Sequence, residues 1–244
     1  MPRHHLRLMV HFSDPGPLLK ASFHKPIRSF VRREGRLTPA QERAIDELLP
    51  RYRIDPGAGH LRLNEIFGNT QPVVMEIGFG NGSLLAEQSA SHPEYNFIGI
   101  EVHRPGIGRL LQQLDRQGSQ NVRISDRDAI ELLEDNIPEN SLDAIWLYFP
   151  DPWPKKRHHK RRIVNSHFLD LAARTLKRHG LLHMATDWQE YAEHMRAEIS
   201  THTRFSLVAS PDRKYYPFAR PSTHFEQRGR RKGHQVSDLY AVLT

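Results

Sequence analysis

The stretch VVMEIGFGNGS at residues 73–83 decides the fold of this chain. Its first five residues form an apolar run, and a short apolar run bounded by turn residues predicts a buried strand. Gly78, Gly80 and Gly82 follow at once, and glycines let the backbone turn sharply and approach a ligand closely. A helix is expected to begin at Ser83. A strand, a glycine-rich turn and a helix in this order predict the nucleotide-binding opening of a doubly wound α/β sheet.

The spacing of the glycines leaves more than one class of cofactor open. A dinucleotide fingerprint has the pattern GxGxxG, whereas here the third glycine comes one residue early and Ser83 stands in its place. Glu76 lies two residues before Gly78, and the pattern ExGxGxG resembles the first motif of the class I S-adenosylmethionine-dependent methyltransferases. A nicotinamide-binding dehydrogenase is the alternative, and an ordinary tight turn between strand and helix would hold no cofactor at all.

The composition predicts one globular domain with a polyanionic partner. The 244 residues carry a formal net charge of +7, and nucleic acid is the commonest partner of so basic a protein. The chain has no cysteine, which excludes disulfides and cysteine-ligated zinc. Its 16 histidines show no metal-ligand spacing such as HExxH, so no metal is expected. No apolar run is long enough for a bilayer and no signal peptide is evident, so we expect a cytoplasmic protein without a membrane partner.

The chain is predicted to consist of a flexible basic arm at residues 1–35 and one domain at residues 36–244. The arm has scattered prolines and arginines without periodicity. Thr38, Pro39 and Gln41 form a capping-box pattern, which predicts a helix that ends near Leu49. From residue 71 the chain alternates between strand and helix. This alternation indicates a mainly parallel, seven-stranded, doubly wound sheet with helices on both faces.

The hydrophobic pattern places the strands at residues 73–77, 96–102, 121–125, 142–149, 181–185, 205–209 and 236–242. Helices are expected at residues 38–49, from residue 83 onward, and at residues 105–117, 129–136, 163–177 and 188–199. Gly180 is expected to mark the end of the helix at residues 163–177.

Acidic side chains recur where the first five expected strands end. They are Glu76 within the first strand, Glu101 at the end of the second, and Asp128, Asp151 and Asp187 after the third, fourth and fifth. Ligands of a parallel sheet bind outside the carboxyl ends of the strands, so these carboxylates should line one edge. Glu101 is suited to ribose hydroxyls and Asp128 to an adenine amino group. Glu76 would favour the ammonium or sulfonium part of a methyl donor.

The fourth strand leads into the segment YFPDPWPKKRHHKRR at residues 148–162. Prolines stiffen the turn around Asp151, and Trp153 offers a ring on which a base can stack. This turn is similar to the DPPY turn of methyltransferases that modify nitrogen atoms. The cations that follow are expected to bind phosphate beside the reaction centre. A solvated loop or a nuclear-localisation signal is the alternative interpretation of such a run.

Taken together, five motifs resemble the bacterial tRNA (guanine-N7-)-methyltransferase family. They are EIGFGNG, GIEVH, FPDPWPKKRHHKRRIV, HMATDW and RPSTHFEQRGRRKGHQVSDL, and the match runs from about residue 28 to about residue 239. The longer motifs are specific to that family, unlike the glycine turn. The resemblance implies a class I methyltransferase fold and transfer of a methyl group from S-adenosylmethionine to N7 of a guanine. The implied guanine is position 46, in the variable loop of tRNA.

The resemblance also implies roles for individual residues. The implied cofactor-binding residues are Glu76, Gly78, Gly80, Gly82, Glu101, Asp128 and Asp151, and Asp151 is also the implied catalytic residue. The implied substrate-binding residues are Lys155, Asp187, Thr223, His224, Phe225 and Glu226. The implied RNA-binding residues are Arg157, His158, His159, Lys160, Arg161 and Arg162. A monomer is expected, with a homodimer left open.

The implied reaction is consistent with these side chains. Guanine N7 already has a free lone pair, so catalysis should consist mostly of alignment and exclusion of water. Asp151 would either hold the guanine edge or stabilise the charge that develops on the ring, and the sequence does not decide between these roles. His224 stands where the family usually has lysine. Because histidine titrates at about 6.5, tRNA binding is expected to depend on pH if His224 faces phosphate, whereas a His224 side chain that points to solvent would have little effect.

Overall fold

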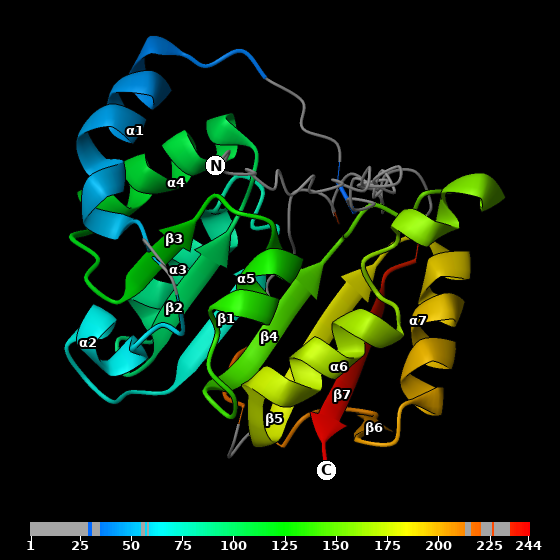
Figure 1. Ribbon diagram of the computed structural model, residues 1–244. Coiled ribbons are helices and arrows are strands. Elements are labelled where there is room, and N and C mark those ends of the chain that lie inside the picture. The colour runs from blue at the N-terminus through cyan, green and yellow to red at the C-terminus, as the bar shows by residue number, and fades with distance from the viewer. Residues whose placement is uncertain are drawn as a thin grey trace, which may run out of the picture.

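A computed structural model describes residues 29–30, 35–54, 57, 59–212, 216–220, 226 and 235–244. These residues form three layers, in which one sheet lies between two groups of helices (Figure 1). The predicted flexible arm falls mostly outside the described residues, so that prediction stays open.

The central sheet has seven strands in the order β3-β2-β1-β4-β5-β7-β6. The strands are β1 (Val73–Ile77), β2 (Asn96–Ile100), β3 (Val122–Ser125), β4 (Leu142–Tyr148), β5 (Leu176–Thr186), β6 (Phe205–Val208) and β7 (Ser237–Leu243). The first five pair in parallel, whereas β7 is antiparallel to both of its neighbours, β5 and β6. The prediction of a mainly parallel, seven-stranded, doubly wound sheet is confirmed.

Helices cover both faces of this sheet, as predicted. Three of them, α1 (Pro39–Tyr52), α3 (Ser83–Ser91) and α4 (Arg104–Gln117), pack into one apolar cluster. The other four, α2 (Leu63–Phe67), α5 (Ala129–Asp135), α6 (Ser166–Thr175) and α7 (Gln189–Thr201), pack into a second cluster on the opposite face. Among the residues that the structure describes, no helix is long and apolar enough to cross a membrane.

The start of α1 confirms the capping box that the sequence predicted. The Thr38 hydroxyl accepts a hydrogen bond from the Gln41 amide, and the Gln41 side chain accepts one from the Thr38 amide at 2.9 Å. The Gln41 side chain also donates to the Pro105 carbonyl at 3.1 Å, which ties α1 to α4. The helix continues past its expected end near Leu49 and stops at Tyr52.

The prediction of a helix at residues 163–177 was wrong at both ends. The α6 helix begins only at Ser166, where the Asn165 side chain caps it, and it ends at Thr175. Residues 176–186 are strand, so Gly180 lies inside β5 and does not end a helix. In the pairing with β4, Leu142 faces Leu176 but Ala144 already faces Leu181, so residues 177–180 bulge out of the sheet. The bulge contains Lys177 and Arg178 and ends at Gly180, and cations followed by glycine are also typical of the end of a helix, which explains the error.

A short segment, Tyr216–Arg220, completes the core on the face that carries α1, α3 and α4. Tyr216 and Phe218 are both buried. The Phe218 ring packs edge-on against Trp146 of β4, with ring centroids 5.1 Å apart. The Ala219 carbonyl accepts a hydrogen bond from Gln88 of α3 at 3.4 Å. This segment therefore anchors the connection between β6 and β7 inside the apolar core.

Candidate active site

The carboxyl ends of the parallel strands bring the predicted acidic residues to one edge of the sheet. Glu76 lies in β1, Glu101 directly follows β2, and Asp128 follows β3. Asp151 and Asp187 come after β4 and β5 in the same way. Because these five strands run in the same direction, their carboxyl ends share that edge.

Glu76 is a buried carboxyl group with an unused oxygen. Its side chain is 4% exposed, and its Oε2 atom has no hydrogen-bond partner among the described residues. Burial, helped by the nearby carboxylate of Glu101, raises the pKa of Glu76 to about 8. A buried acceptor of this kind suits a ligand that brings a positive charge or a hydrogen-bond donor.

The glycine turn after β1 is shaped for close approach. Gly78 has a φ of 75°, which non-glycine residues rarely adopt, and a Cβ there would meet nothing within 4 Å. The first turn of α4 lies directly against this loop, because a Cβ on Gly106 would come within 2.0 Å of the Gly80 carbonyl oxygen. The loop and α4 therefore form one rigid wall beside the end of β1.

Glu101 holds that wall in place. Its Oε2 atom accepts a hydrogen bond from the Gly80 amide at 2.8 Å. Its Oε1 atom accepts from the amides of Val102 and His103 at 2.8 Å and 2.9 Å. A carboxylate offers about four acceptor positions, so one position is left for a ligand hydroxyl. Glu101 therefore shapes the glycine turn as well as being placed for the ribose contact that the sequence predicted.

Asp128 also has a structural role that the sequence did not show. Its Oδ1 atom accepts from the Ile130 amide at 2.9 Å and caps the start of α5. A carboxylate retains further acceptor positions after one such bond, so the predicted contact with an adenine amino group remains compatible with this cap.

The turn after β4 is held in an unusual backbone conformation. Phe149 and Trp153 have φ angles of 52° and 45°, both in the left-handed region that bulky residues avoid. The Phe149 amide donates to the Ala185 carbonyl at 2.7 Å, which ties the turn to the end of β5. The Trp153 indole donates to the Ser29 carbonyl at 3.0 Å. Asp151 is exposed between these fixed points.

The cations after this turn form a short 3-10 helix, η1 (Lys156–Arg161), and they differ in orientation. The exposed members of the run are Lys155, Lys156, Arg157 and Lys160, whereas His158, His159 and Arg161 are half-buried. The Arg161 guanidinium lies 4.0 Å from the centre of the Trp153 ring and donates to the Phe30 carbonyl. The exposed members remain suited to phosphate.

Arg162 was predicted to face RNA, but the structure buries its side chain. Its side chain is only 1% exposed, and it forms an ion pair with Glu190 of α7. An arginine in this position cannot reach a phosphate without breaking that pair. The error arose because Arg162 continues the run of exposed cations in the sequence.

A buried polar network that the sequence analysis missed lies beneath the turn. Tyr148 and His183 share a hydrogen bond of 2.7 Å, and His183 Nε2 lies 2.9 Å from Asp238 of β7. Arg220 donates twice to the Asp238 carboxylate and also to Glu226. Burial lowers the pKa of His183, although its hydrogen bond to Asp238 acts in the opposite direction. Polar residues within the apolar strands β5 and β7 were the signal that would have revealed this network.

The predicted substrate residues are only partly described. Glu226 is 2% exposed and is the ion-pair partner of Arg220. Lys155 is exposed at the start of η1, and Asp187 is half-buried after β5. Thr223, His224 and Phe225 lie outside the described residues, so their predicted roles stay predictions. Among the residues with described positions, no group of three or more His, Asp or Glu side chains could hold a metal ion.

Comparison with known proteins decides between the two classes of enzyme. Residues 70–239 match the protein family described as "Putative methyltransferase". The chain is 50% identical to the tRNA (guanine-N(7)-)-methyltransferase of Nitrosococcus oceani over 215 residues, which cover 88% of this chain and 90% of that protein. It is 51% identical to the enzyme of the same name from Alkalilimnicola ehrlichii over 223 residues, covering 90% of this chain and 94% of that protein. The chain belongs to the tRNA (guanine-N7-)-methyltransferase family.

The sheet topology agrees with membership of this methyltransferase family. A dinucleotide-binding dehydrogenase sheet has the order 3-2-1-4-5-6, with the sixth strand next to the fifth. Here the antiparallel β7 is inserted between β5 and β6. The dehydrogenase alternative is therefore set aside.

Proposed function

We propose that this protein transfers a methyl group from S-adenosylmethionine to N7 of a guanine in tRNA, at position 46 of the variable loop. The observation that carries the proposal is the near-full-length similarity to curated enzymes named for guanine-N7 methylation of tRNA. A tRNA substrate implies a cytoplasmic site of action.

The residues at the sheet edge fit the proposed cofactor. The unused Oε2 atom of Glu76 would face the positively charged methionyl part, and the remaining acceptor position of Glu101 would take a ribose hydroxyl. Asp128 would accept from the adenine amino group. The glycine turn leaves the backbone open to close approach, since Gly78 has no side chain and a Cβ there would meet nothing within 4 Å. When bound, S-adenosylmethionine supplies the electrophilic methyl group.

The protein's part in the reaction is alignment. The guanine N7 lone pair is available without removal of a proton, so no strong general base is needed. The turn around Asp151 is fixed at β5 through Phe149 and at residue 29 through Trp153, and Asp151 follows β4 at the edge of the sheet where the proposed cofactor-binding residues lie. A fixed carboxylate there would hold the guanine edge or stabilise the positive charge that the ring acquires.

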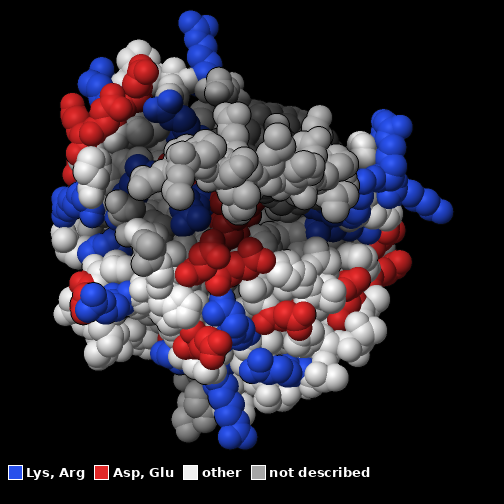
Figure 2. Space-filling model, in the orientation of Figure 1, with Lys and Arg blue, Asp and Glu red and all other residues white. Residues whose placement is uncertain are grey.

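The exposed cations of η1 are the proposed phosphate contacts. Lys155, Arg157 and Lys160 project from the segment that directly follows the turn, so they would bind the tRNA backbone next to the reacting base. On the face that carries α5 and α6, the described residues show a mixture of acidic and basic side chains and no continuous basic surface (Figure 2). RNA binding is therefore assigned to the turn and η1, and not to that face.

One experiment tests the proposal directly. Unmodified tRNA transcripts are incubated with labelled S-adenosylmethionine and the protein, and the nucleosides are then separated. We expect 7-methylguanosine from a transcript with guanine at position 46 and none from a matched transcript with adenine there. A different methylated nucleoside would refute the base assignment. Equal labelling of both transcripts would refute the position.

A further inference from the structure

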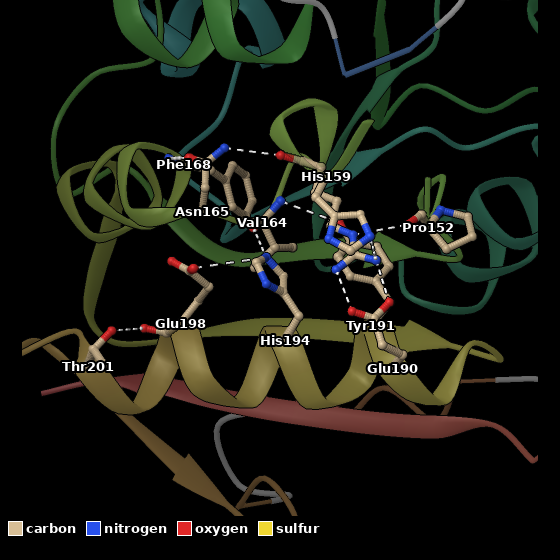
Figure 3. Close-up of polar contacts among 11 residues, drawn as sticks. Pro152, His159, Val164, Asn165, Phe168, Glu190, Tyr191, His194, Glu198 and Thr201 are labelled. Carbon is tan, nitrogen blue, oxygen red and sulfur yellow. Dashed lines mark hydrogen bonds and ion pairs between the residues drawn. The ribbon is translucent and has the colours of Figure 1, made fainter. Parts of the chain in front are cut away.

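Arg162 connects three parts of the molecule that meet behind the turn after β4. Its Nε atom donates to the Pro152 carbonyl at 2.9 Å, inside the turn. Its Nη1 atom donates to Glu190 at 3.0 Å, and its Nη2 atom reaches the other oxygen of the same carboxylate. Nη2 also lies 3.2 Å from Nε2 of His159 in η1. Figure 3 shows Pro152, His159 and Glu190, the three partners of Arg162, close to one another.

The guanidinium makes four polar contacts within the protein. It has five N–H donors in a fixed fork, and here the fork is shared between a main-chain carbonyl, a carboxylate and an imidazole. Since a guanidinium can only donate, His159 Nε2 must be the acceptor in its contact. The guanidinium carbon also lies 4.9 Å from the centre of the Tyr191 ring. This side chain has no surface left for a phosphate.

The chain that follows Arg162 is fixed to the same helix. The Val164 carbonyl lies 2.9 Å from Nε2 of His194, and the Val164 amide lies 3.5 Å from the Tyr191 hydroxyl. Glu190, Tyr191 and His194 all belong to α7. The first turns of α7 therefore form the support on which the end of η1 rests (Figure 3).

The turn needs such a support because its backbone is strained. Residues in the left-handed region persist only when their surroundings fix them, and both Phe149 and Trp153 lie in that region. The Phe149 end is held by β5 through the Ala185 carbonyl. On the other side of Asp151, the hydrogen bond from Arg162 to the Pro152 carbonyl connects the turn to α7, because Arg162 also pairs with Glu190.

We infer that Arg162 and Glu190 are positioning residues for methyl transfer, which set the place of Asp151 by fixing the Pro152 carbonyl against α7. The inference rests on the proposed function, because it assumes that Asp151 acts on the substrate. It separates Arg162 from the neighbouring cations, which would bind phosphate. Loss of the Arg162–Glu190 pair should therefore lower kcat and leave the affinity for tRNA almost unchanged.

The decisive variant is Glu190→Gln, with Glu193→Gln as its matched control. Both substitutions remove one carboxylate from α7 and leave every lysine and arginine in place. Glu193 is exposed and contacts Gln189 of its own helix, not the turn. Displacement of a reacting group by about 1 Å can cost about a hundredfold in rate, so we expect a fall in kcat of about tenfold or more for Glu190→Gln. The control should keep the wild-type kcat.

Three further measurements distinguish positioning from phosphate binding. The KM for tRNA and the salt dependence of its affinity should stay within about twofold of wild type in Arg162→Gln, whereas Lys160→Gln should lower the log–log salt slope by about 0.7–0.9. Arg162→Lys should recover part of the lost kcat. Without any substrate, trypsin should cut at residues 155–161 several times faster in Glu190→Gln than in Glu193→Gln.

A reduced salt slope with unchanged kcat in Arg162→Gln would overturn the inference and make Arg162 a phosphate ligand. Equal trypsin cleavage and equal kcat in the two Glu→Gln variants would also overturn it. If Arg162→Gln does not fold, the Glu190→Gln comparison decides alone. If the wild-type protein makes a different methylated nucleoside, the proposed function fails, but the proteolysis comparison still tests the support of the turn.

Discussion

Replacement of Glu76 by Gln should stabilise the cofactor-free protein at neutral and alkaline pH. Glu76 is buried in β1 with an oxygen that has no partner among the described residues. Burial raises its pKa from 4.5 to about 8, so the folded protein keeps the carboxyl group neutral at a pH where the unfolded chain has released the proton. Gln has nearly the same shape and never ionises.

The sign and size of the effect follow from this pKa. Because the folded-state pKa is raised, the stability due to the neutral acid is complete below pH 4.5 and is lost as the pH rises toward 8. Over the whole interval the loss is on the order of 5 kcal/mol, as an upper limit. Between about pH 6 and pH 8, the wild type should lose about 2 kcal/mol more than Glu76→Gln.

The assay is urea unfolding followed by circular dichroism at several pH values between 6 and 8. The exposed Glu139→Gln serves as the control, since it removes the same charge from the surface. Other titrating groups cancel when wild type and variant are compared at each pH. Parallel stability curves for wild type and Glu76→Gln would show that Glu76 is ionised in the folded protein and would refute the reasoning.

Three further outcomes are expected. Asp151→Ala should abolish most methyl transfer and leave circular dichroism unchanged, and near wild-type turnover would remove Asp151 from the catalytic role. Glu101→Ala should weaken S-adenosylmethionine binding in calorimetry by about 1–3 kcal/mol and affect tRNA binding far less, while unchanged cofactor affinity would contradict the assignment. Neutralising the exposed Lys155, Arg157 and Lys160 together should raise the tRNA dissociation constant and reduce the salt slope by about 0.7–0.9 for each phosphate contact, and an identical slope would mean a solvated surface.

The sheet and its acidic edge could be predicted because their signals are local. An apolar run followed by alternate glycines determines the strand, the turn and the next helix within residues 73–91. Parallel strands then bring Glu101 and Asp128 to the same edge through the topology alone. The hydrogen bond from the Gly80 amide to Glu101 was not predictable, since it joins two segments that are 21 residues apart in the sequence.

The sequence of the basic run at residues 155–162 did not predict which of its side chains are exposed and which are buried. Lys160 and Arg162 lie two residues apart in the same basic run, yet one is exposed and the other is buried. Arg162 is buried because it pairs with Glu190, which belongs to a helix later in the chain. The sequence of the basic run does not indicate that partner. The bulge that contains Gly180 has a similar explanation, because strand register depends on the pairing of β5 with β4.

The anchored segment Tyr216–Arg220 affects how the connection between β6 and β7 can change. Because the segment packs in the core against Trp146 and Gln88, the long connection behaves as two shorter loops that are closed separately. Closure entropy depends only weakly on the length of each loop, so insertions on either side should be tolerated thermodynamically. Chimeras that exchange residues 227–234, and keep both the anchor and the buried Glu226 that pairs with Arg220, should therefore fold. Such exchanges offer a way to redirect substrate choice without disturbing the sheet.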